Sequence, residues 1–281
     1  MITIGLTTWT EHPGLIGGET RKVRLTEYAG FFPLVEVDTS FYGIPSSSTI
    51  EKWQSEVPEN FQFILKANQL MTRHDEGKEE VDELTRMQAF RDFKKAIRPL
   101  VKAGQLKTIL FQFPPFFIRS VVNFQWLERI RREMGDLPIA VEFRSPTWYQ
   151  PAVVDDLMAY LTSINMTHVI ADEPHNLSNG VPFVPTVTTP KLALLRLHGQ
   201  NQAGWLDKSK DWRGKRTLYH YSDEELAKFA EAVKTLADQA EEVCVIFNNN
   251  AGRDAAPNAL TVKSQLNLEW HGLGPQQLDL F

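Results

Sequence analysis

Short apolar runs that end in charged or amide residues recur along this chain, and most of them alternate in polarity. The clearest example is Val35-Glu36-Val37-Asp38, and residues 139–144 and 192–198 repeat the pattern. Successive side chains of a strand point to opposite faces, so Glu36 and Asp38 share one face and the valines the other. This pattern is typical of a parallel barrel strand, whose outer face packs on helices and whose inner C-terminal end lines a site.

Eight such runs alternate with amphipathic helical patterns over most of the chain. Alternating strands and helices predict a parallel sheet, and eight repeats in 281 residues favour a closed sheet. We therefore predict an α/β fold, a single (β/α)8 TIM-type barrel. The predicted strands are Ile2–Thr7, Leu34–Asp38, Phe61–Lys66, Thr108–Phe113, Ile139–Phe143, Thr167–Asp172, Leu192–His198 and Val243–Asn248.

Two stretches interrupt the alternation, after the sixth and the seventh strand. Residues 175–190 are rich in Pro, Thr, Asn and Gly, and residues 200–221 are polar, aromatic and basic. We therefore expect irregular long loops in both places. Long loops at this end of a barrel are usually functional. The barrel domain is expected to span residues 1–271, followed by a C-terminal tail over residues 272–281.

Charge and cysteine content narrow the class of protein. A net charge of −5 argues against a chain held on nucleic acid by bulk charge, although a local basic groove is compatible with it. The single cysteine excludes a disulfide within one chain. The first residues lack the features of a signal peptide, and no apolar stretch is long enough to cross a membrane. We expect a cytoplasmic protein without a membrane partner.

Following the alternation along each strand gives a set of inward-facing side chains at the barrel mouth. Four carboxylates face three fixed cations and one histidine, which allows paired groups with shifted pKa values. The expected catalytic residues are Glu142, Asp172, Asp38 and His198. The expected substrate-binding residues are Glu36, Lys66, Gln112, Arg144, Arg196, Asn248, Asn250, Trp9, Tyr42, Trp148 and Trp205.

A metal site and a cofactor are not expected. Asp38, Glu142, Asp172 and His198 have suitable ligand atoms on four strands, but no tight ligand spacing accompanies them. The cations of the same mouth disfavour a dication and favour an anionic group on the substrate. No glycine-rich dinucleotide or phosphate loop follows a strand.

Acid–base chemistry is the reaction class that these residues suggest, because the chain has no nucleophile elbow. We expect an enzyme of the hydrolase or lyase type acting on a sugar- or phosphate-bearing small molecule. Trp148 and Trp205 would stack on a ring, since flat apolar faces beside polar groups suit sugars and bases. The alternative is a non-catalytic ligand-binding barrel, in which the mouth charges are structural.

Seven segments carry further information when they are taken together: residues 35–42, 61–66, 111–115, 140–144, 195–199, 247–250 and 257–259. Together they resemble the YunF/YecE-like family, known as domain of unknown function 72. The resemblance implies a TIM-type barrel and supplies no reaction. Two positions depart from the family pattern: Met71-Thr72-Arg73-His74 stands where a sequence close to Ile-Thr-His is usual, and Ser145 stands where a histidine is common.

The end of the chain suggests a protein partner. The segment Gln277-Leu278-Asp279-Leu280-Phe281 resembles the peptide with which bacterial polymerases and repair proteins bind the DNA sliding clamp. Leu278, Leu280 and Phe281 would anchor in an apolar cleft, and the Gln277 amide would fix the register. A nucleic-acid maintenance protein recruited through this tail is therefore an alternative function. In that function, Arg213, Lys215 and Arg216 would contact the nucleic-acid backbone. We nevertheless favour the interpretation of this basic cluster as a solvated loop.

Overall fold

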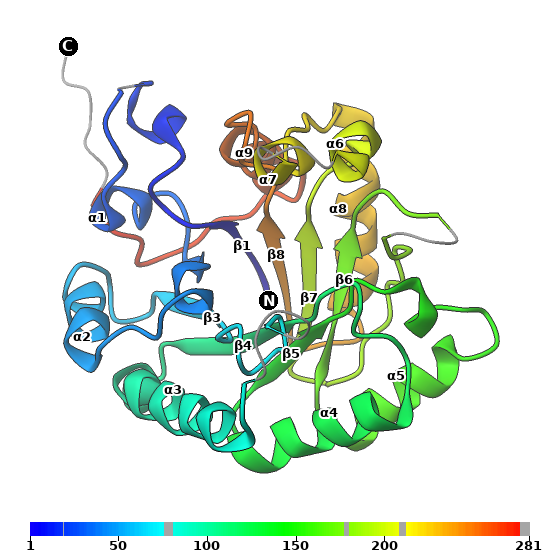
Figure 1. Cartoon of the computed structure of the whole chain (residues 1–281). Helices are drawn as coiled ribbons and strands as arrows, with labels where there is room; N and C mark the ends of the chain where they lie inside the picture. Colours follow the sequence, from blue (N-terminus) through cyan, green and yellow to red (C-terminus); the bar gives the residue numbers. More distant parts are fainter. Residues whose placement is uncertain (19, 76–80, 177–179, 208–211, 276–281) are drawn as a thin grey trace.

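The chain forms a closed barrel of eight parallel strands in sequence order, β1 to β8, in a computed structural model (Figure 1). The structure describes residues 1–18, 20–75, 81–176, 180–207 and 212–275. The strands are β1 Ile2–Thr7, β2 Leu34–Val37, β3 Gln62–Lys66, β4 Leu106–Gln112, β5 Ile139–Glu142, β6 Thr167–Asp172, β7 Leu192–Leu197 and β8 Glu242–Phe247. The predicted (β/α)8 barrel and its eight strands are confirmed.

Helices surround the barrel and connect its strands (Figure 1). The α-helices are α1 Leu25–Tyr28, α2 Ser47–Ser55, α3 Glu83–Ala103, α4 Val121–Met134, α5 Val154–Ser163, α6 Gln202–Leu206, α7 Trp212–Arg216, α8 Asp223–Ala237 and α9 Ala255–Gln265. Three short 3-10 helices are η1 Pro13–Ile16, η2 Thr39–Phe41 and η3 Pro146–Trp148. The Ser222 side chain accepts from the Glu225 backbone N–H and closes a capping box that starts α8.

Apolar side chains fill the lower half of the barrel interior. Leu34, Ile64 and Leu110 belong to a buried apolar cluster to which seven of the strands contribute. Gly5 of β1 makes room for this layer, because a Cβ atom at that position would lie 2.6 Å from the Leu34 carbonyl oxygen. The polar layer lies above this apolar cluster. It begins with Glu36, Lys66 and Gln112, which follow Leu34, Ile64 and Leu110 by two residues on the same strands.

The two long connections lie at the C-terminal ends of the strands. Helices α6 and α7 belong to the connection after β7, and Figure 1 shows them beyond the arrowheads of β7 and β8. The described part of the connection after β6 contains no helix. None of the described helices is long and apolar enough to cross a membrane. The described segments at the barrel mouth are thus two short helices and irregular chain, outside the layer of longer helices around the strands.

Candidate functional site

A sealed ion-pair layer forms the floor of the barrel mouth. Arg196 of β7 donates through Nε to Glu36 Oε2 at 2.8 Å and through Nη2 to Glu36 Oε1 at 2.5 Å. Its Nη1 donates to Glu142 Oε2 and, at 3.1 Å, to Gln112 Oε1. The side chains of Glu36, Glu142 and Arg196 are all 0% exposed, so this layer cannot touch a ligand without rearrangement. The expected substrate-binding role of Glu36 and Arg196 stays a prediction, and their burial means that a ligand would reach them only after the ion pairs rearrange.

The two carboxyls of this layer differ in proton affinity. Burial raises the pKa of Glu36 to about 6, against the attraction of Arg196. Burial also opposes ionisation of Glu142, but Arg144 and Arg196 outweigh it and hold its pKa well below the usual range. Glu142 is therefore a permanent anion that two guanidinium groups share.

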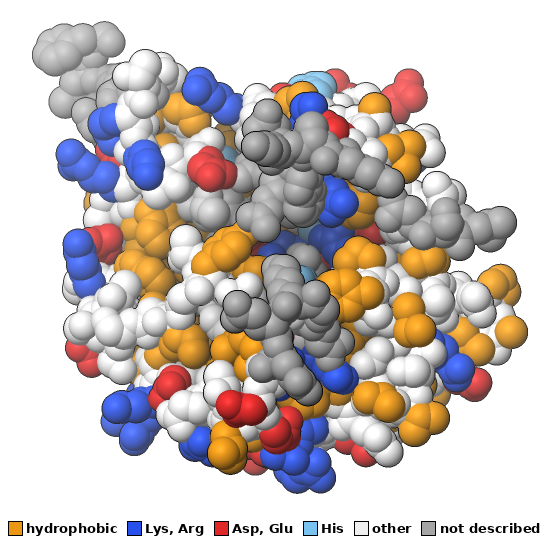
Figure 2. Space-filling model, viewed as in Figure 1, with side chains coloured by type: hydrophobic (Ala, Val, Ile, Leu, Met, Phe, Trp, Pro, Cys, Tyr) orange, Lys and Arg blue, Asp and Glu red, His pale blue; other side chains and the backbone are white. Residues whose placement is uncertain are grey.

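Arg144 lies above this floor and joins three side chains. Its Nη2 lies 2.5 Å from Glu142 Oε1 and 2.9 Å from His198 Nε2, and its Nη1 donates to Glu173. The Arg144 side chain is 10% exposed, so it is the part of this cluster that reaches solvent. The ring of Trp205 lies 5.3 Å from the guanidinium, within the range of a cation–π contact. Figure 2 shows Lys or Arg atoms in the hollow at the centre of this face.

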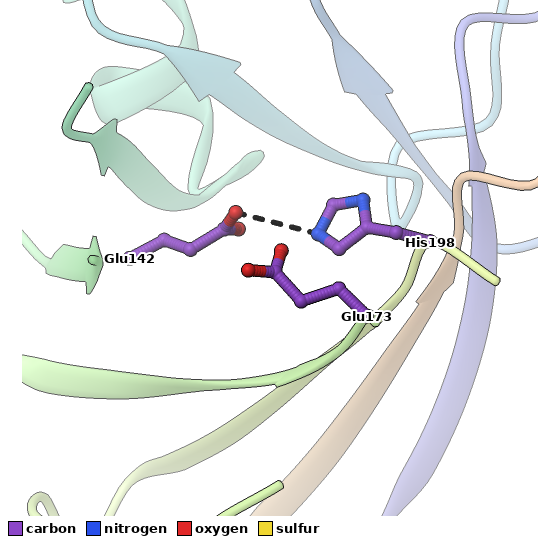
Figure 3. A group of neighbouring side chains, drawn as sticks. All are labelled: Glu142, Glu173 and His198. Carbon is purple, nitrogen blue, oxygen red and sulfur yellow. Dashed lines mark ion pairs between the residues drawn. The ribbon is translucent and has the colours of Figure 1, made fainter. Parts of the chain in front are cut away.

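Glu173 is a site residue that the sequence analysis missed. It follows β6 and points toward Glu142 and His198 (Figure 3). Its Oε1 accepts a hydrogen bond from the Val181 backbone N–H at 3.0 Å, and its side chain is fully buried. Burial raises the pKa of Glu173 to about 8, against the attraction of Arg144. Glu173 therefore holds a proton at neutral pH in the same cluster where Glu142 does not.

Asp172 is the residue that the sequence analysis named in its place, and that assignment is wrong. Ala171 pairs with Arg196 in the β6–β7 register, so Ala171 and Glu173 face inward and Asp172 faces the opposite way. Its carboxylate accepts from Tyr221 at 2.5 Å and from Gln200 at 2.6 Å. Burial raises the pKa of Asp172, against those two hydrogen bonds. Its described contacts are with the connection after β7. They do not include the central cluster, which consists of Glu142, Arg144, Glu173 and His198.

His198 connects the cluster to the loop after β8. Its Nδ1 lies 2.8 Å from Asn248 Nδ2, and its Nε2 lies 3.3 Å from Glu142 Oε1. Burial, and then the charge of Arg144, lower the pKa of His198 to about 3. The imidazole is therefore neutral at pH 7 and positions Arg144 without adding charge.

Asp38 and Lys66 form a second pair on the more open side of the mouth. Lys66 Nζ lies 3.5 Å from Asp38 Oδ1, and the Asp38 side chain is 30% exposed. Burial opposes ionisation of Asp38, but Lys66 and Arg196 lower its pKa. Gln112 lies between the two arginines, and its Oε1 also accepts from Arg144 at 3.4 Å. Lys66, Asp38 and Gln112 are placed at the mouth, as the strand alternation predicts.

The expected aromatic residues occupy different environments. Trp148 is fully buried, stacks on Phe143 at 4.3 Å and donates its N–H to the Phe117 carbonyl, so its ring is closed to a ligand. This corrects its expected stacking role. Trp9 packs edge-on against a tryptophan of α2, and Tyr42 is 59% exposed. Among the four expected aromatics, Trp205 contacts the central cluster.

Two carboxyl groups and one imidazole come close enough together to hold a metal ion. One ligand atom each of Glu142, Glu173 and His198 lies within 4.8 Å of the others (Figure 3). Arg144 contacts all three of these side chains. Its positive charge stands where a cation would bind, so a metal would have to displace it. The absence of a metal and of a cofactor stays a prediction.

The two predicted partner surfaces are only partly described. Gln277, Leu278, Leu280 and Phe281 lie outside the described residues, as does the side chain of Arg213. The boundary between a barrel and a tail at residue 272 and the cytoplasmic location also stay predictions.

Comparison with known proteins places this barrel in a family. The family model described as "Protein of unknown function DUF72" matches residues 3–279. The chain belongs to the DUF72 family. The UPF0759 protein YunF of Bacillus subtilis is 39% identical over 284 residues, with both chains fully covered. The UPF0759 protein YecE of Escherichia coli is 25% identical over 260 residues, 84% of this chain and 91% of the relative.

Solved structures of DUF72 proteins share the fold. One from Enterococcus faecalis has a TM-score of 0.91 at 42% identity and covers 99% of this chain and 100% of its own. One from Thermotoga maritima has a TM-score of 0.79 at 28% identity and covers 95% of this chain and 100% of its own. These likenesses confirm the family that the sequence resembles, a family whose own description states no activity.

Proposed function

We propose that this DUF72 barrel is an enzyme that performs acid–base chemistry on a sugar- or phosphate-bearing small molecule. One observation carries the proposal: Glu142 and Glu173 hold the same guanidinium, yet their pKa values are displaced in opposite directions. Pairs of carboxyls with opposed pKa values divide the roles of acid and base in many hydrolases.

Each group of the cluster receives a role from its protonation and exposure. Glu173 donates the proton, because its pKa of about 8 keeps it protonated at neutral pH. Glu142 stays ionised and serves as the base or stabilises developing positive charge. Arg144, which is partly exposed, binds an anionic or carbonyl oxygen of the substrate. Neutral His198 orients Arg144, and the buried Glu36–Arg196 pair keeps the floor rigid.

Access to the two carboxyls depends on Arg144. Both carboxyl side chains are 0% exposed, whereas the guanidinium between them reaches solvent. A ligand anion that draws Arg144 outward would uncover both groups at once. One oxygen of Glu142 and one of Glu173 lie no more than 4.8 Å apart, near enough for both carboxyls to contact one substrate molecule.

The proposal is tested with chromogenic glycosides and phosphate esters. Wild-type protein should release the chromophore from a subset of them, and Glu173→Gln and Glu142→Gln should each lower kcat by about a hundredfold or more. Arg144→Gln should raise KM, because it removes the group that binds the substrate. Glu231→Gln, at a 74% exposed position of α8, is the matched control.

The pH profile gives a second readout. Because Glu173 acts as the acid, the rate should fall as pH rises through about 8. Turnover that both carboxyl variants retain would refute the assigned roles. A screen without any turnover, combined with a carbon-13 NMR titration in which Glu173 behaves as an ordinary carboxyl, would refute the enzyme proposal.

A non-catalytic ligand-binding barrel is the second candidate. The complete burial of Glu36, Glu142 and Arg196 favours it, because ion pairs sealed in this way can serve the fold alone. In that case Arg144→Gln should abolish ligand binding, while the Glu173→Gln variant should bind ligand as the wild type does.

A further inference from the structure

A basic groove lies beside the central cluster on the same face of the barrel. Its volume is about 760 Å³, and it is lined by the connections that follow β1, β7 and β8. Among the residues that the structure describes, the charged side chains that line it are Glu11, Arg21, Lys22, Lys215 and Arg253. Four of these five are cationic, in a chain whose net charge is −5. The groove is therefore locally positive, although the chain as a whole is negatively charged.

Two of these cations are committed to carboxylates of the protein. Arg21 donates to both oxygens of Glu27 at 2.8 and 2.7 Å, and Lys215 lies 2.5 Å from Asp207. Lys22 and Arg253 are exposed, and neither has an ion pair with any carboxylate in the described part of the chain. An anion in the groove would supply the missing counter-charge.

The backbone of Arg253 adds an independent observation. Its φ angle is +67°, in the left-handed region that glycine or asparagine normally occupies. The preceding residue is Gly252, so the turn has a glycine beside the strained position and an arginine on it. The Arg253 N–H donates to the Asn250 carbonyl at 2.9 Å, which closes the turn over the groove. Strain retained at a side chain that lines a cavity points to a role for that side chain.

Two connections join the groove to the central cluster. In the loop after β8, Asn248 contacts His198 and Asn250 donates to Glu11 in the groove wall. In the connection after β7, Lys215 lines the groove, and the next residue, Arg216, lies 5.0 Å from the ring of Trp205. The same ring also contacts Arg144 at 5.3 Å. The groove wall and the surroundings of the cluster are therefore built from the same two connections.

We propose that this groove binds the phosphate group of the substrate, while the reacting part of the same molecule lies at Arg144. The inference rests on the proposed function and narrows its substrate class to phosphorylated small molecules. Arginine and lysine side chains bind phosphate oxygens strongly, and Arg253 can do so with two parallel N–H groups. The volume falls in the range of about 300–1,000 Å³ typical of small-molecule sites, which favours a compact ligand over a polymer.

Calorimetric titration of the full-length protein with inorganic pyrophosphate tests the groove. Wild-type protein should bind the probe, and Arg253→Gly and Lys22→Gln should each weaken binding about tenfold, since each removes a charge-assisted hydrogen bond. Lys234→Gln, an exposed lysine of α8 outside the groove, is the control of equal charge change. Arg253→Gly should also raise the melting temperature by about 2 °C, because glycine relieves the backbone strain.

Four outcomes decide the inference. Pyrophosphate binding that Arg253→Gly and Lys22→Gln each weaken about tenfold, and that Arg144→Gln leaves unchanged, supports it. Binding that is absent from the wild type, or unchanged in both groove variants, overturns it. Binding of a single-stranded oligonucleotide in place of pyrophosphate, lost in the same variants, overturns it in favour of a nucleic-acid surface. Groove binding together with an ordinary titration of Glu173 refutes the proposed chemistry and leaves the phosphate site intact.

Discussion

Glu173 is the position where one substitution reports most directly on the site. In Glu173→Gln an amide of nearly the same shape replaces a buried carboxyl that is protonated at neutral pH. The amide cannot ionise, so the variant keeps its side chain neutral at every pH. The two proteins should therefore differ in how their stability depends on pH, more than in stability at any single pH.

The magnitude follows from the displacement of the pKa. The folded protein holds this proton with a pKa of about 8, compared with a pKa of 4.5 for an ordinary glutamate. Since the folded state binds the proton more tightly than the unfolded chain does, the free energy of unfolding of the wild type falls as pH rises. A tenfold change in proton affinity is about 1.4 kcal/mol, so the loss totals about 5 kcal/mol between the two pKa values. The free energy of unfolding of Glu173→Gln lacks this pH-dependent decrease.

Urea denaturation across the range from about pH 5 to about pH 8 measures the effect. The unfolding free energy of Glu173→Gln minus that of the wild type should increase by about 3.5 kcal/mol over this range and level off above it. Losing the charge-assisted hydrogen bond to Arg144 costs about 1.5–3 kcal/mol and displaces the whole curve without changing its slope. Glu231→Gln should follow the wild type at every pH. Parallel curves for Glu173→Gln and the wild type would refute the buried, protonated carboxyl.

Three further predictions concern the barrel itself. Arg196→Met should lower the free energy of unfolding at pH 7 by about 3–5 kcal/mol, because it leaves buried Glu36 without its ion-pair partner and Glu142 with Arg144 alone, and a loss below about 1 kcal/mol in urea denaturation would contradict this. Gly5→Ala should cost about 1–3 kcal/mol, since its Cβ would lie 2.6 Å from the Leu34 carbonyl oxygen, and an unchanged melting temperature would count against that packing. Buried Cys244, whose pKa burial raises, should resist an aromatic disulfide reagent at pH 7 until urea unfolds the chain; rapid labelling of the folded protein would disprove its burial.

Strand alternation predicted the inward direction of most side chains at the barrel mouth, because backbone geometry makes successive side chains of a strand point to opposite faces. Glu36, Glu142 and Arg196 occupy strands with one apolar and one polar-tipped face, so counting in steps of two assigned them inward correctly. The same count failed on β6, where every residue is buried and both faces carry polar side chains. Without a contrast between the faces, the inward position could not be distinguished between Asp172 and its neighbour.

Loop side chains were beyond the reach of the same reasoning. Trp148 follows β5 in a short 3-10 helix, and its direction depends on packing against Phe143 and Phe117 rather than on a repeat. Trp205 lies in α6, a helix of five residues within a stretch that the sequence predicts as irregular. The strand residues thus follow a period that a sequence displays, whereas the loop residues follow contacts that only the folded chain makes.

The link between Arg196 and Glu36 also constrains how this barrel can assemble. These residues are 160 positions apart, on β7 and β2, and Glu142 on β5 shares the same guanidinium. A half-barrel of the first four strands would enclose Glu36 without its cation, and bringing distant segments together costs chain entropy before any contact rewards it. We therefore expect charge neutralisation in the interior to accompany closure of the barrel, and we expect neither half of this chain to be stable as an isolated piece.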